Sequence, residues 1–177
     1  MIAADQYGAA LWSLAKADGT QDAVLETLCG VRDALVQNPD YIKLLDTPAI
    51  PTDEKRGLVD QAFGECEQNV LNFIKILCEK HAVYQLHDCV KAYIRLYNEE
   101  NGITEAACIT INPLTDEQRD ALKAKLSAMT GKRVKLTEQT DSSLVGGIVV
   151  LVDGKKFDGS VKTRLDGFRQ ALADTIV

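Results

Sequence analysis

The spacing of the apolar residues changes at Gly102, and this change limits what the chain can fold into. Before Gly102, apolar side chains recur every three or four residues, as on one side of a helix. Beyond it, short runs of alternating or β-branched residues indicate strands. A chain of 177 residues that is 46% hydrophobic is long enough for two small cores. We therefore predict an α+β protein with two domains, residues 1–104 and 105–177.

The first domain is predicted to be an antiparallel bundle of six helices with short connections. The helical spacing covers residues 3–17, 24–35, 39–46, 52–63, 69–80 and 86–97. Asn38 and Thr52 are predicted to cap the third and fourth helices. Gly8 should weaken the first helix by up to about 1 kcal/mol relative to alanine. The helix at 69–80 is apolar around most of its circumference, which fits either a central core helix or a helix with one side facing a partner.

The second domain is predicted to be a small α/β unit in the order strand, helix, strand, hairpin, helix. Strands are expected at 108–112 and 134–137, on either side of a helix that begins with a capping box at Thr115 and Gln118. The run 148–152 and the returning strand 155–158 form a hairpin around Asp153-Gly154, a turn that accepts positive φ at both positions. Ser160 should begin a last helix, with an apolar stripe formed by Val161, Leu165, Phe168 and Leu172.

Charge and hydropathy exclude several classes of function. The net charge is −6, and residues 1–105 carry 9 Lys/Arg against 17 Asp/Glu. Neither half has the concentrated positive charge that nucleic acid binding needs, so no nucleic acid partner is expected. The longest apolar run has five residues, whereas a membrane span needs about 20, so we expect no direct membrane insertion. The five cysteines lack framework spacing and are expected to be reduced.

Motifs for catalysis or for a bound group are weak. Residues 130–133 read Thr-Gly-Lys-Arg, without the first glycine and the final hydroxyl of a phosphate-binding loop. Cys78, His81, His87 and Cys89 lack the tight cysteine pairs typical of zinc sites. No nucleophile and base can be paired from the sequence. We expect no catalytic residues, no metal and no cofactor, which favours a binding protein.

The C-terminal motif resembles a known family. Gly146-Gly147-Ile148, followed by Asp158-Gly159-Ser160-Val161, is similar to the C-terminal signature of the delta subunit of F-type ATP synthases, whose mitochondrial member is the oligomycin-sensitivity-conferring protein. Leu151 departs from the family pattern, which usually has a polar residue there. The resemblance extends over the whole chain in length and order of elements, and it assigns Gly146, Gly147, Asp158, Gly159 and Ser160 a structural role.

The resemblance implies a stator subunit without catalytic activity. Such a subunit links the catalytic head to the peripheral stalk and resists rotor torque, which couples proton transport to ATP synthesis. The first domain would bind N-terminal segments of the alpha subunits, and the second the b subunits of the peripheral stalk. The location implied is the cytoplasmic face of the bacterial cell membrane, reached through the ATP synthase complex.

Carried over by position, the family's groove between the first and fifth helices has one wall from each helix. The residues concerned are Tyr7, Ala10, Leu11 and Leu14 on one wall and Val70, Phe73, Ile74 and Leu77 on the other. On this hypothesis Ile74→Asp should abolish docking and leave the fold intact. Two alternatives are an unrelated helical adaptor and a small enzyme with a pocket between its domains.

Overall fold

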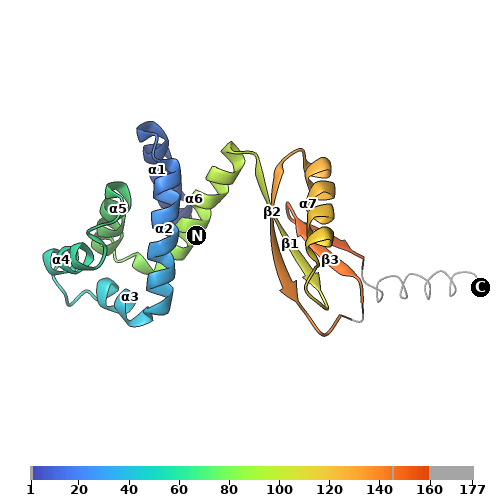
Figure 1. The fold of residues 1–177 in the computed structure, drawn as a ribbon. Helices are drawn as coiled ribbons and strands as arrows, with labels where there is room; N and C mark the ends of the chain where they lie inside the picture. Colours follow the sequence, from blue (N-terminus) through green and yellow to red (C-terminus); the bar gives the residue numbers. More distant parts are fainter. Residues whose placement is uncertain (1, 145, 160–177) are drawn as a thin grey trace, which may run out of the picture. The chain divides into compact units, whose positions relative to one another are not determined.

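The computed structural model describes residues 2–144 and 146–159, with side chains from Ala4 onward, and has an α+β fold (Figure 1). It divides into two compact units, Met1–Asn98 and Glu99–Val177. The division falls within the last turn of helix α6 (Leu86–Glu100), a few residues before the predicted position. Gly102 follows that helix with a φ of 59°, a conformation that glycine adopts without strain.

The N-terminal unit is built from helices. They are α1 (Ile2–Asp18), α2 (Gln21–Gln37), α3 (Pro39–Asp46), α4 (Thr52–Phe63), α5 (Gln68–Glu79), the 3₁₀ helix η1 (Val83–Gln85) and α6. Helices are therefore present at all six predicted places, and η1 occupies what was predicted to be a plain link. One hydrophobic core joins these helices, with Leu28, Leu35, Ile74 and Tyr93 among its largest completely buried side chains.

Helix ends follow the predicted chemistry only in part. The Thr115–Gln118 capping box is present at the start of α7 (Asp116–Thr130), as predicted. Asn38 stands at the predicted cap position of α3, before Pro39, but its side chain makes no capping hydrogen bond; its Nδ2 donates to the Ala34 carbonyl at 2.8 Å. Thr52 is the first residue of α4 and lies after the cap position, so its predicted role as a cap is wrong.

The close approach of α1 and α6 explains the glycine in the first helix. A Cβ on Gly8 would lie 2.6 Å from the Cys89 carbonyl oxygen and 2.7 Å from the Ala92 Cβ. Those distances are shorter than van der Waals contact, so the two helix backbones meet at a point where only glycine fits.

The C-terminal unit is a four-stranded sheet with one described helix. Its strands are β1 (Ile103–Thr110), β2 (Arg133–Thr140), β3 (Ile148–Val152) and β4 (Lys155–Asp158), in the order β2-β1-β3-β4. β1 runs parallel to β2 and antiparallel to β3, and β4 pairs antiparallel with β3. The predicted hairpin turn is confirmed, with φ values of 49° at Asp153 and 73° at Gly154. The helix predicted after Ser160, and Ser160 itself, lie outside the described residues.

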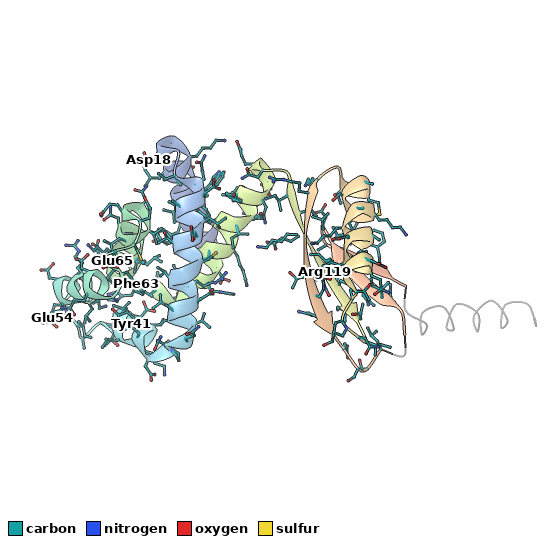
Figure 2. All side chains as sticks on the ribbon, in the orientation of Figure 1. Asp18, Tyr41, Glu54, Phe63, Glu65 and Arg119 are labelled. Carbon is teal, nitrogen blue, oxygen red and sulfur yellow. The ribbon has the colours of Figure 1, made fainter. Side chains whose placement is uncertain are left out.

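Helix α7 covers one face of the sheet, where it contacts β2. The core beneath it is small and consists of Ala106, Leu126, Val150 and Val152, with four partly buried aliphatic residues around them. The Arg119 guanidinium, labelled in Figure 2, contacts the Glu138 carboxylate of β2 and so connects α7 to that edge of the sheet. Glu138 in turn raises the pKa of Arg119, and Arg119 lowers the pKa of Glu138.

Candidate functional site: the surface along α1 and α5

Helices α1 and α5 are neighbours in the N-terminal unit. The Asn69 side chain, in the first turn of α5, donates a hydrogen bond from Nδ2 to Oδ2 of Asp18, the last residue of α1, at 3.0 Å. Asp18 is labelled in Figure 2. This contact identifies which side of each helix faces the other, and therefore which residues lie along the line where the two helices meet.

The predicted groove residues fall into two groups. Leu11, Val70, Phe73, Ile74 and Leu77 are buried in the helical core, and Tyr7 is half-buried against it. Ala10 and Leu14 are exposed, Leu14 by 46%. The structure therefore brings the predicted residues of both helices to one region, but those of α5 point inward.

Ile76 is a large apolar residue of α5 that is exposed and was not predicted to belong to the groove. It is 45% exposed and lies seven residues, or about two helical turns, after Asn69, on the side of α5 that faces α1. Leu14 lies one turn before Asp18 on the corresponding side of α1. Leu14 and Ile76 thus border the line between the helices, with the buried Phe73 below it. In the sequence, residues 69, 73 and 76 are spaced by four and three, so they lie on one side of a helix, and this spacing was the signal for Ile76.

This surface is suited to binding a helix. Two large aliphatic side chains on neighbouring helices stay partly in water, and covering them would release roughly 25 cal/mol for each Å² buried. A helix with an apolar stripe can cover both at once, because its side chains at positions i, i+3, i+4 and i+7 lie on one side. We name Ala10, Leu14 and Ile76, together with Phe73 below them, the α1–α5 surface.

The thiols of the N-terminal unit are placed for packing. Burial raises the pKa of Cys78 and that of Cys89 to about 11, so both thiols stay protonated at neutral pH. Within residues 2–144 and 146–159, no three His, Cys, Asp or Glu side chains gather in a way that could hold a metal ion. Over the same residues, no helix has both the length and the apolar character to cross a membrane.

These features define a class before they define a family: a two-unit α+β protein with half-exposed aliphatic side chains on two neighbouring helices of its N-terminal unit. The sequence model of the family described as "ATP synthase delta (OSCP) subunit" matches residues 3–172. The chain belongs to this family. The resemblance seen in the motif from Gly146 to Val161 is thereby confirmed.

Individual relatives agree over nearly the whole chain. ATP synthase subunit delta of Clostridioides difficile (strain 630) is 30% identical, over 99% of this chain and 98% of that protein. The subunit delta of Salinibacter ruber is 31% identical, over 96% of this chain and 90% of that protein. A chain in the cryo-EM structure of the Toxoplasma gondii mitochondrial ATP synthase hexamer shares the fold, with a TM-score of 0.73 at 23% identity, covering 96% of this chain and 97% of that one.

Family membership settles the functional class. Subunits of this family belong to the peripheral stalk, or stator, of F-type ATP synthase and catalyse no reaction, so this chain is a structural subunit and not an enzyme. Its partners are therefore other subunits of ATP synthase, and the unrelated adaptor and the small enzyme are not favoured.

Proposed function

We propose that the N-terminal unit is an antiparallel six-helix bundle that attaches to the catalytic head by binding an N-terminal helical segment of the alpha subunits along the α1–α5 surface. The observation that carries this proposal is the pair of half-exposed aliphatic side chains, Leu14 and Ile76, on two neighbouring helices. Of the residues predicted from the sequence, Ala10 and Leu14 contact the segment. Leu11 and Phe73 lie below it, and Val70, Ile74 and Leu77 support the surface from the core.

The C-terminal unit, in this proposal, binds the b subunits of the peripheral stalk at the cytoplasmic face of the bacterial membrane. Rotation of the central shaft is useful for ATP synthesis only if the head does not turn with it. A subunit that joins head to stalk has to resist that torque through slow dissociation at both of its interfaces. No side chain of this chain takes part in chemistry.

The test uses exposed residues, because only these separate docking from folding. Leu14→Asp and Ile76→Asp replace half-exposed side chains, so both variants should fold, yet each places a carboxylate where the partner's apolar stripe would lie. We expect each to weaken the binding of a synthetic alpha-subunit N-terminal peptide at least about tenfold, measured by calorimetry. Ile74→Asp is unsuitable, because Ile74 is completely buried and the change would disrupt the core.

Val36→Asp is the matched control. Val36 is 61% exposed on α2, away from the α1–α5 surface. The Val36→Asp variant should therefore bind the peptide as tightly as the unchanged chain does. The proposal would be refuted if Leu14→Asp and Ile76→Asp kept full affinity, or if Val36→Asp lost as much as they did. Leu14→Asp should also still co-purify with b subunits, because the altered residue belongs to the other unit.

A further inference from the structure

Helix α4 contributes little to the hydrophobic core of the N-terminal unit. Among its twelve residues, all of which the structure describes, Val59 is the only apolar side chain that is fully buried. Leu58 and Phe63 are partly buried against the core. Helix α5, against which α4 packs (Figure 1), buries six side chains. Apolar burial is the main force that holds a helix in a fold, so α4 has to depend on other contacts.

Charged side chains supply much of the contact between α4 and α5. The Lys75 ammonium of α5 lies 2.5 Å from the Asp60 carboxylate of α4, and the Arg56 guanidinium of α4 pairs with Glu79 of α5. Asp60 is 49% exposed and Arg56 48%, so water and dissolved ions reach both pairs. Exposed ion pairs are individually weak and are screened by salt. The attachment of α4 should therefore weaken as the ionic strength rises.

A third contact between the same two regions buries a charge. Lys55 of α4 is 1% exposed, and its Nζ lies 3.3 Å from Nδ1 of His81, an imidazole rather than a carboxylate. Removing an ammonium group from water is costly unless an opposite charge lies against it. Lys55 regains water when α4 moves away from α5, so its burial works against the closed position.

Helix α3 gives α4 a defined closed position through one aromatic residue. The Tyr41 hydroxyl donates to the Leu58 carbonyl at 2.8 Å, and the Tyr41 ring meets that of Phe63 edge-on, with centroids 6.4 Å apart. Both rings are labelled in Figure 2. Apart from Val59 and Lys55, the largest completely buried side chains of the unit come from elements other than α4. The rest of the core can therefore stay packed when α4 opens.

We propose that α4 is a strap on α5, which opens and closes as a unit while the other helices stay folded, and that ionic strength sets how often it opens. Elements with few buried apolar contacts open at a lower free energy than the whole domain, and α4 has this character. The charged contacts with Lys75, Glu79 and His81 give the strap its sensitivity to salt.

Two buried thiols distinguish opening of α4 from unfolding of the whole unit. Cys78 stands directly before Glu79 on α5; burial raises the pKa of its thiol to about 11, and the nearby charge of Lys55 opposes that rise. Cys89 is equally buried, with a pKa also raised to about 11, but it lies on α6 where that helix meets Gly8 of α1. A thiol reagent should reach Cys78 when α4 opens, and Cys89 only when α1 and α6 separate.

Labelling of the full-length chain with iodoacetamide, followed by mass spectrometry of its peptides, measures both rates in one sample. At about pH 7.5 we expect Cys78 to be labelled at least tenfold faster than Cys89. Between about 50 mM and 500 mM sodium chloride, the rate at Cys78 should rise at least twofold and that at Cys89 should not rise. Equal rates at the two cysteines, or a rate at Cys78 that salt leaves unchanged, would overturn the proposal.

Substitutions of exposed residues test the contacts themselves. Arg56→Gln and Asp60→Asn each remove one pair between α4 and α5, and each should speed the labelling of Cys78 about two- to fivefold without changing that of Cys89. Arg32→Gln is the matched control, because Arg32 pairs with its neighbour Asp33 within α2. An equal effect of Arg32→Gln would overturn the proposal. So would a rate at Cys89 that rises together with that at Cys78, because the whole unit would then be unfolding.

Discussion

At the scale of single residues, Gly8 is where helix propensity and packing disagree most. Gly8→Ala would favour an isolated helix by about 1 kcal/mol. In the folded unit, however, the added methyl group meets the Cys89 carbonyl and the Ala92 side chain. We expect the variant to lower the free energy of unfolding by about 1–3 kcal/mol, as overpacking usually does. Urea unfolding measures it.

Gly30→Ala is the control for this substitution. Gly30 lies within α2, and a Cβ there would have no atom within 4 Å. We expect Gly30→Ala to raise the free energy of unfolding by up to about 1 kcal/mol. If Gly8→Ala stabilised the chain as Gly30→Ala does, the close approach of α1 and α6 would be wrong.

The sequence predicted that Gly8 weakens α1, and it could not predict why glycine stands there. Propensity describes a residue within its own helix, whereas the contact that excludes a side chain comes from α6, about 80 residues later. The prediction placed Ile74 rather than Ile76 in the groove for the same reason: contacts with other helices cannot be read from the pattern of one helix. An apolar pattern around most of a helix shows that it is buried on several sides, but it does not show which side remains open.

The burial of two thiols should make the stability of the folded chain depend on pH in the alkaline range. Burial raises the pKa of Cys78 and Cys89 to about 11, while the unfolded chain releases these protons near pH 9. Between pH 9 and 11 the folded chain therefore holds more protons than the unfolded chain, so stability falls as pH rises, by up to about 1.4 kcal/mol per pH unit for each thiol.

The measurement is the urea midpoint at pH 8 and at pH 10. Cys89→Ala should be less stable at both pH values because it leaves a cavity. Its stability should fall less between pH 8 and pH 10 than that of the unchanged chain. An equal loss in both chains would contradict the assignment of this pH dependence to the Cys89 thiol.

At the scale of elements, one carboxylate connects α3 to η1. The Asp46 side chain accepts from the Val83 and Tyr84 backbone N–H groups, each at 2.9 Å. Asp46→Ala leaves both donors without this acceptor, and we expect a loss of about 1–3 kcal/mol in the free energy of unfolding. Thermal unfolding measures it. Asp40→Ala, in the same helix, removes only a surface pair with Lys43 and should change stability by no more than about 0.5 kcal/mol.

A helix end was predicted correctly where two side chains of the sequence cap it together. The Thr115–Gln118 capping box uses two side chains that each need the other, and it formed as predicted. Asn38 is a single side chain that can also donate. Its Nδ2 donates to the Ala34 carbonyl of the preceding helix, and its side chain makes no capping hydrogen bond to α3. Likewise, Asp46 bonds to two residues of η1 that follow it by 37 and 38 positions in the chain. A pattern of neighbouring residues cannot predict a contact over that distance.

At the scale of the whole molecule, the two units have separate hydrophobic cores. The buried residues of one core all lie between Ala4 and Tyr93, and those of the other between Ala106 and Val152. The change in apolar spacing at Gly102 was enough to find this division within a few residues, because each core is built from consecutive elements.

Separate cores predict that residues 1–105 fold alone. We expect this fragment to keep the helical circular dichroism of α1–α6 and to melt cooperatively, because all the large buried side chains of its core lie within it. In the full chain, Gly8→Ala should lower the melting temperature of one transition and leave the other unchanged. A fragment without cooperative melting, or a full chain in which both units shift together, would contradict this independence. If the N-terminal unit binds the head and the C-terminal unit binds the stalk, as we propose, a weakened N-terminal unit should release the head while the C-terminal unit stays bound to the stalk.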